Sequence, residues 1–314
     1  MSAVQIVFSY YCSFEYIQKV EIIMHQYLKA IGFGNLSTKK ELKEILNQVE
    51  KKFTHQTIIS FNKSADFCEF EKEFGQQIGI ALYGEIDENE NFDADYYMPY
   101  FQGGGITTYS EVIVEKRIDR EQYVGICEDP KVGISLIFTL KNGIDYQKEC
   151  QISGMSRPNT SVTFSGLALS GKILLPVQKS QNQIKNVSDA SDNRKNLLNA
   201  ARNGDQNAIE TLTLDDIDIY SQVSRRLLYE DVFTIVDTYF MPYGVECDIY
   251  SIMGEILNVK EAENLVTKEK LYQLRLDVNE LQFDICVPKK EVLGEPEIGR
   301  RFKGNIWLQG EINF

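Results

Sequence analysis

Histidine is nearly absent from this sequence, since the 314 residues include only His25 and His55. Most zinc sites and the serine–histidine or cysteine–histidine catalytic arrangements use histidine, so the rest of the chain cannot supply them. Positive charge is also scarce: 33 Lys and Arg stand against 46 Asp and Glu, which gives a net charge of −13. A field of that sign repels phosphate backbones and disfavours nucleic acid as a partner.

Two further absences concern membranes and thiol chemistry. No apolar run approaches the roughly 20 residues that a transmembrane helix needs, which disfavours a membrane protein. No CxxC pair is present, so we predict buried, reduced thiols in a cytosolic protein at Cys12, Cys68, Cys127, Cys150, Cys247 and Cys286. The overall composition, 43% hydrophobic and 25% charged residues, is typical of a soluble globular protein. The length of 314 residues is sufficient for two domains.

The N-terminal part divides into an initial stretch without regular periodicity and a predicted helical segment. Residues 1–23 lack the basic and apolar regions of a signal peptide and any regular periodicity, and we expect the native start at Met24. Residues 24–71 are predicted as an N-terminal helical segment. Its clearest helix begins at a capping box of Thr38 and Glu41 and carries an apolar stripe: Leu42, Ile45, Leu46, Val49 and Phe53.

Short β-rich runs follow from residue 107 to residue 175, separated by Gly, Pro, Asn and Asp, as in a meandering antiparallel sheet or small barrel. Residues 179–228 are predicted as a polar linker followed by a helical hairpin. Within that hairpin, Asn203 and Gly204 would end the first helix and Asp205 would begin the second. The chain then returns to β-rich sequence until its end.

A rare five-residue sequence occurs twice, as YYMPY at residues 96–100 and as YFMPY at residues 239–243. After each copy come a Tyr-Ser pair, a predicted strand ending in Asn, and a segment of the form F-x-G…G-x-I, in the same order and at similar spacing. These matches indicate a tandem duplication. We therefore predict an α+β fold with two antiparallel β-modules, residues 72–178 and 229–314. Each is expected to be a small barrel or curled sheet, with an OB-like barrel as one form it could take.

The repeated segments should do the same structural work in both modules. Proline lacks an N–H and fixes φ, so Pro99 and Pro242 are expected at sheet edges. The flanking aromatics would close the core of each module, with Tyr100 equivalent to Tyr243. Tyrosines on a barrel face also stack bases or sugars, so a ligand platform stays the second interpretation, with a core role preferred; the candidate residues are Tyr96, Tyr100, Tyr239 and Tyr243.

Three motifs approach known ligand sites without completing them. The stretch from Gly166 to Lys172 resembles a phosphate-binding loop but continues with Ile173 and is predicted as a strand. The run Gly103–Gly105 lacks the third glycine of a dinucleotide fingerprint and is predicted as a turn. The acidic stretch at residues 87–95 has calcium-loop spacing without the glycine and glutamate that such a loop needs, and is predicted as a solvated loop.

Four phrases carry a resemblance to a known family: MHQYLKAIGF, AARNGDQNAIETLTLDDIDIYS, EDVFTIVDTYFMPYG and GEPEIGRRFKGNIWLQGEI. Together they resemble an uncharacterised bacterial family of about this length that is known only as a domain of unknown function. The resemblance covers Met24 to Phe314 and implies a cytoplasmic bacterial protein. It supplies no activity, cofactor or catalytic residue.

The function predicted from these observations is a non-catalytic, cytosolic binding or assembly protein, without catalytic residues, metal or cofactor. A protein partner or self-association is preferred to nucleic acid, and no membrane is expected. The first alternative is a small-molecule sensor or an enzyme with a Tyr/Asp/Arg site between the two modules. The second alternative is a single-stranded nucleic-acid binder that uses an OB-like barrel and a basic face.

Overall fold

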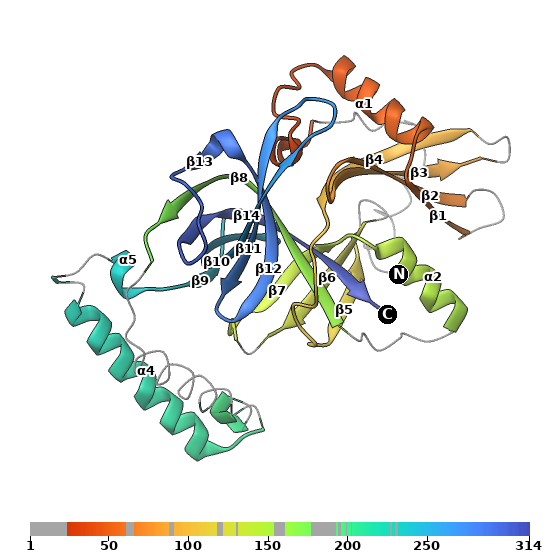
Figure 1. Cartoon of the computed structure of the whole chain (residues 1–314). Helices are drawn as coiled ribbons and strands as arrows, with labels where there is room; N and C mark the ends of the chain where they lie inside the picture. Colours follow the sequence, from red (N-terminus) through yellow and green to blue (C-terminus); the bar gives the residue numbers. More distant parts are fainter. Residues whose placement is uncertain are drawn as a thin grey trace, which may run out of the picture.

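A β-barrel, a separate β-sheet and a few helices form a mixed α+β fold (Figure 1). The computed structural model describes residues 24–60, 66–87, 91–117, 122–129, 131–153, 161–176, 203–226 and 232–314, together with residues 193, 196–198, 200, 201, 228 and 229. The barrel has five strands with additional strands attached, and the sheet has four antiparallel strands. The predicted α+β class is confirmed at this level.

The four-stranded sheet contains β1 (His55–Ser60), β2 (Asp66–Gly75), β3 (Ile78–Ile86) and β4 (Phe92–Phe101), in that order. One face packs on α1 (Lys39–Lys51) and on the 3-10 helix η2 (Gln26–Ile31), while α2 (Gly143–Ser153) lies at the opposite face (Figure 1). The prediction of a helical segment over residues 24–71 is therefore only half correct. Alternation of apolar and acidic residues along β2 gives it two different faces, which suits a strand between two layers.

Helix α1 forms as its sequence predicts. The Thr38 hydroxyl accepts a hydrogen bond from the Glu41 N–H at 3.2 Å, and the Glu41 carboxylate accepts from the Thr38 N–H at 3.1 Å. These two bonds satisfy N–H groups that the first turn of a helix leaves without partners. The four apolar side chains of the stripe that lie within the helix are buried against the sheet: Leu42, Ile45, Leu46 and Val49.

The barrel is closed by five strands in the order β8 (Ser161–Leu174), β12 (Leu281–Pro288), β11 (Lys270–Val278), β10 (Ile249–Glu263) and β14 (Arg301–Asn313). β14 closes it by pairing antiparallel with β8. A parallel contact of β14 with β7 (Ser135–Leu140) adds the meander of β6 (Tyr123–Glu128) and β5 (Val112–Lys116). Two short strands, β9 (Tyr239–Pro242) and β13 (Val292–Leu293), pair with β10 and β8, and the 3-10 helix η3 (Lys289–Glu291) precedes β13.

The expectation of one barrel or sheet per predicted module is wrong. β8, the last strand of residues 72–178, is a member of the barrel whose other four strands come from residues 229–314. Nearly all of its first eight side chains are buried, so β8 needs neighbours that cover both of its edges and both of its faces. β12 and β14 provide the paired edges. Among the described residues of 72–178, the only pairing with β8 is an isolated bridge between Thr108 and Val162.

Between the two β-rich regions, the predicted helix boundary is confirmed. Gly204 has a left-handed backbone (φ +87°), and the Asp205 carboxylate accepts hydrogen bonds from the N–H groups of Asn207 and Ala208. The helix that follows, α4 (Gln206–Arg226), is longer than the short helix expected, and α5 (Val232–Ile235) comes next. The initial stretch, residues 1–23, and most of the polar linker lie outside the described residues.

A buried glutamine of β14 joins the four-stranded sheet to the barrel. The Gln309 amide nitrogen donates to the Pro99 carbonyl at 2.9 Å, and its amide oxygen accepts from the Phe101 N–H at 3.1 Å. The Ser165 hydroxyl donates to the Phe101 carbonyl at 2.7 Å. Backbone groups at the edge of β4 thus bind side chains of β14 and β8 where a neighbouring strand would otherwise be needed.

Both prolines of the repeated segments lie in edge strands, as predicted, but in different sheets. Pro99 lies in β4 at the end of the four-stranded sheet, and Pro242 lies in β9, which pairs with β10. The expected equivalence fails at the last aromatic residue, because Tyr100 is 2% exposed and Tyr243 is 52% exposed. β9 ends at Pro242, so Tyr243 lies just beyond the end of the strand, where its side chain is exposed to solvent.

Candidate functional site

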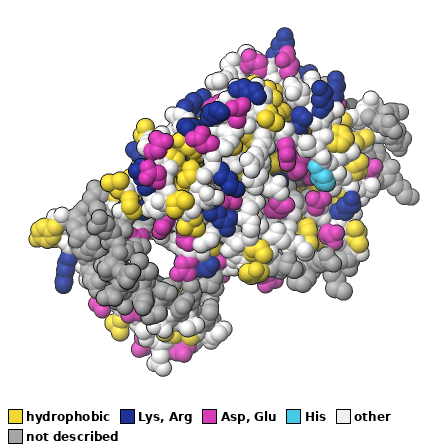
Figure 2. All heavy atoms as spheres, viewed as in Figure 1, with side chains coloured by type: hydrophobic (Ala, Val, Ile, Leu, Met, Phe, Trp, Pro, Cys, Tyr) yellow, Lys and Arg dark blue, Asp and Glu magenta, His cyan; other side chains and the backbone are white. Residues whose placement is uncertain are grey.

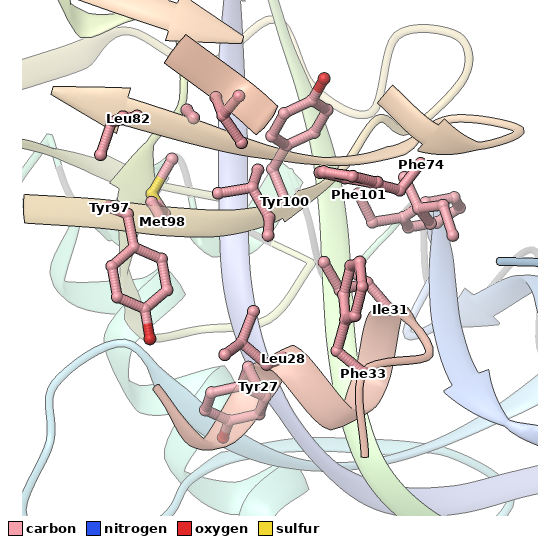
Figure 3. Packing of buried hydrophobic residues seen from close by; sticks show 14 of the residues in the cluster. Tyr27, Leu28, Ile31, Phe33, Phe74, Leu82, Tyr97, Met98, Tyr100 and Phe101 are labelled. Carbon is pink, nitrogen blue, oxygen red and sulfur yellow. The ribbon is translucent and has the colours of Figure 1, made fainter. Parts of the chain in front are cut away.

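Of the tyrosines of β4, Tyr97 and Tyr100 are buried in the core, and Tyr96 is partly buried against it. Tyr100 and Tyr97 project from opposite faces of the strand, and Tyr97 points toward η2 (Figure 3). The Lys141 ammonium lies 4.5 Å from the centre of the Tyr100 ring, a cation–π contact inside the protein. The Tyr96 ring stacks on Tyr83 with 4.5 Å between ring centres. Each of these contacts covers one face of the tyrosine ring.

The tyrosines of the second copy lie elsewhere and do not join the first pair. Tyr239 belongs to β9, and its hydroxyl lies 3.3 Å from the Ser251 hydroxyl of β10. Tyr243 is the exposed member of the set. The four predicted site residues therefore lie on two separate sheets, and the structure does not bring them together.

A cluster of ionisable side chains is buried between the four-stranded sheet and α2. Glu69 and Glu71 project from the same face of β2, and Glu69 is only 2% exposed. Lys141, which is buried just before α2, lies with its Nζ 3.9 Å from the Glu311 Oε2. Asp145 stands in the first turn of α2. Four carboxyl groups thus gather around one lysine.

Burial raises the pKa of Glu69 well above its usual range. The negative charges of Glu71 and Asp145 act in the same direction, whereas a hydrogen bond from Tyr83 and the charge of Lys141 act against it. The pKa of Glu71 is raised as well, chiefly by burial. Beside the cluster lies a cavity of only about 10 Å³, the space of about one water molecule. The cavity beside the cluster therefore has no room for a ligand.

A larger polar cleft lies where the four-stranded sheet meets the outside of the barrel. Its volume is about 210 Å³, and its lining is Gln77, Phe101, Gly104, Asn258, Lys260, Gln273, Arg275 and Asp284. The floor is formed by side chains of β10, β11 and β12 that point away from the barrel interior, because the alternate residues, such as Leu274 and Leu276, are fully buried inside it. The β2–β3 turn and the chain after β4 form the opposite wall.

The three-glycine run after β4 shapes this wall. The Gly104 N–H donates to the Asp284 carboxylate at 2.7 Å, and the Gly104 carbonyl accepts from the Arg275 guanidinium. A Cβ at Gly103 would lie 2.5 Å from the Phe164 carbonyl of β8, so only glycine lets the chain come this close. The run was predicted as a simple turn; it is a turn that also holds Arg275 and Asp284 in place.

The described lining of the cleft carries more positive than negative charge. Asp284 is balanced by Arg275, whose NH1 lies 3.4 Å from its carboxylate. Lys260 forms no ion pair within the part of the chain that the structure describes. One positive charge is left over, beside the amides of Gln77, Asn258 and Gln273. The cleft is suited to a small, anionic and hydrogen-bonding ligand.

Comparison with protein-family models identifies the family of the chain. The model for "Domain of unknown function, E. rectale Gene description (DUF3881)" matches residues 28–310. The chain belongs to the DUF3881 family. The resemblance predicted from the four sequence phrases is thereby confirmed, and the family description assigns no activity. No curated protein and no solved structure matches the chain.

The cleft of this DUF3881 chain was missed at the sequence level, although its position between residues 72–178 and 229–314 was one of the alternatives considered. Its lining includes Arg275 and Asp284, and its aromatic residue is Phe101. Polar residues that alternate with apolar ones are ordinary on barrel strands, so Lys260 and Gln273 gave no distinct signal. Of the segments that form the cleft, the three-glycine run was the one singled out in the sequence, and it was predicted only as a turn.

Proposed function

We propose that this protein is a cytosolic, non-catalytic binding protein that takes a small anion into the cleft between the four-stranded sheet and the barrel. The observation that carries the proposal is the combination of a cleft of about 210 Å³ with the charge of Lys260, which has no ion-pair partner among the described residues. The cleft is smaller than the roughly 300–1,000 Å³ of drug-sized sites, so a ligand of metabolite size fits it. No transmembrane-type helix occurs among the described residues.

Binding is favoured over catalysis by the chemistry of the lining. Among the described residues of the cleft there is no histidine, cysteine, serine or threonine to act as a nucleophile or a base at neutral pH. Asp284 is engaged by the Gly104 N–H and by Arg275, which hold it as a fixed carboxylate. The groups that remain are a lysine, a guanidinium and three amides, which recognise charge and hydrogen bonds.

A thermal-shift experiment with the full chain tests the proposal. Succinate at low ionic strength should raise the melting temperature by about 2–4 °C when present at about ten times its dissociation constant. Uncharged succinamide, of nearly the same shape, should not. Lys260→Met should abolish the response, whereas Lys172→Met, an exposed lysine on β8 outside the cleft, should keep it. An unchanged response in Lys260→Met, or no response in the wild type, would contradict the proposal.

The nucleic-acid alternative is less well supported. On the face drawn in Figure 2, the described Lys and Arg side chains are interspersed with Asp and Glu and form no continuous basic surface. Phosphate-backbone binding requires several adjacent cations and becomes much weaker as salt increases. Tight, salt-sensitive binding of a single-stranded oligonucleotide by the wild type would restore this alternative.

The duplication is kept as part of the proposal. β8 and β14 pair antiparallel around Ala168 and Ile306, so that Phe164 and Phe302, the proposed equivalents, stand on either side of one local two-fold axis. The location of β4 and β9 in different sheets implies that the copies diverged after the duplication. Superposition of the two copies should be best with Phe164 on Phe302, and a better fit in another register would contradict a common origin.

A further inference from the structure

One residue that lines the cleft, Gln273, carries an unsatisfied amide oxygen. Gln273 is 4% exposed, and its amide nitrogen donates to the Gln76 carbonyl at 2.6 Å. A carbonyl only accepts hydrogen bonds, so this contact fixes which end of the amide is nitrogen. The other end, the Gln273 Oε1, is buried and has no hydrogen-bond partner among the described residues. Such an acceptor is costly unless a donor reaches it.

The residue with the unsatisfied oxygen, Gln273, is the cross-strand neighbour of Lys260. Lys260 of β10 and Gln273 of β11 are direct partners in the antiparallel register. Side chains at such positions begin about 4.5–5.5 Å apart and point to the same face of the sheet. A ligand held by Lys260 through its anionic group therefore has its neighbouring atoms within reach of Gln273.

From this pairing we infer that the ligand of the cleft is an acid with an N–H group next to its carboxylate, either an α-amino acid or an N-acylated one. The inference rests on the proposed anion-binding function and specifies its ligand class. The carboxylate binds Lys260, and the N–H donates to the Gln273 Oε1. Asn258 and Gln77, which also line the cleft, offer further amide groups to the rest of the molecule.

This geometry separates such acids from simple anions. An anion without a donor satisfies Lys260 but leaves the Gln273 oxygen buried and unpaired. One good hydrogen bond to such an oxygen corresponds to about a tenfold difference in affinity. The site should therefore discriminate between two acids that differ only in replacement of N–H by an oxygen.

Isothermal titration of the full chain with matched pairs tests the inference. N-acetyl-L-alanine should bind about tenfold more tightly than the ester (S)-2-acetoxypropanoate, which has the same shape and charge but no N–H. A second pair, L-alanine against N,N,N-trimethyl-L-alanine, which keeps both charges but has no N–H, tests the free amino acid in the same way. Gln273→Met should reduce the difference to less than about twofold, whereas Gln282→Met, on β12 outside the cleft, should preserve it.

Each outcome has a distinct meaning. Equal affinity for both members of each pair in the wild type would overturn the inference while leaving anion binding intact. Absence of binding by all four acids would overturn the proposed function as well. The comparison of ligands on the wild type needs no variant, so it stands even if Gln273→Met proves unstable through loss of the bond to Gln76.

Discussion

Replacement of Glu69 by glutamine should make the protein more stable at alkaline pH. Glu69 is buried, its Oε1 has no hydrogen-bond partner among the described residues, and its pKa is raised first by burial and then by Glu71 and Asp145. A carboxyl whose pKa is higher in the folded than in the unfolded state binds its proton more tightly when folded. Its contribution to stability is complete below the unfolded pKa, about 4.3, and is lost as pH rises through the folded pKa.

The magnitude follows from what glutamine removes. Each unit by which folding raises the pKa corresponds to about 1.4 kcal/mol at pH values above the folded pKa. Glutamine keeps the shape of the side chain, carries no charge at any pH and offers a donor to its surroundings. We expect Glu69→Gln to raise the free energy of unfolding at pH 8 by about 1–3 kcal/mol, the penalty of a buried unsatisfied polar group, and to change it little at pH 4.5.

Urea denaturation between pH 4.5 and pH 9 measures this difference. Glu73→Gln is the matched control, because Glu73 lies on the same strand and face but is exposed, and its curve should follow the wild type. The other charged groups that face Glu69, including Glu71, Lys141 and Asp145, are present in all three proteins, so their effects cancel to first order. If the free energies of unfolding of the wild type and Glu69→Gln differ by the same amount at every pH in this range, Glu69 does not bind a proton more tightly in the folded state.

Three further predictions concern single side chains. Tyr100→Ala should destabilise the protein by about 3–5 kcal/mol and Tyr243→Ala by less than about 1 kcal/mol, because only the first ring is buried; equal urea midpoints would refute this. Lys141→Met should destabilise by about 3–5 kcal/mol at pH 8, since it leaves buried carboxylates without their cation, and by clearly less near pH 4.5 in the same assay. Thr38→Ala should lower stability by about 1 kcal/mol through loss of the N-cap, with Thr38→Ser near wild type in thermal melts.

Local features of the fold were predictable from sequence because their causes are local. The capping box at Thr38, the turn at Gly204 and the N-cap at Asp205 each involve residues within three or four positions of one another. The strand assignment of Gly166–Lys172, against the phosphate-loop alternative, also followed from nearby residues. Helix α2 was missed because its polar and apolar residues form no clear stripe.

The site and the barrel closure depended on contacts that no short sequence window contains. β8 could in principle pair within its own region, and only its full register with β14 decides otherwise. The cleft needs the register of β10 with β11, which sets Lys260 beside Gln273, and the approach of the Gly103–Gly105 run from another sheet. Periodicity assigns such side chains to a face of a strand but does not say what lies opposite.

The side chain of Gln309 has a consequence for the behaviour of the protein at high concentration. An edge strand with free N–H and C=O groups invites pairing with the edge of another molecule, which is a common route to aggregation. At β4, Pro99 has no N–H, its carbonyl is bound by Gln309, and the N–H and carbonyl of Phe101 are bound by Gln309 and Ser165. One buried amide and one hydroxyl thus close this edge to intermolecular pairing, so Gln309→Leu should promote self-association through β4 even where the monomer still folds.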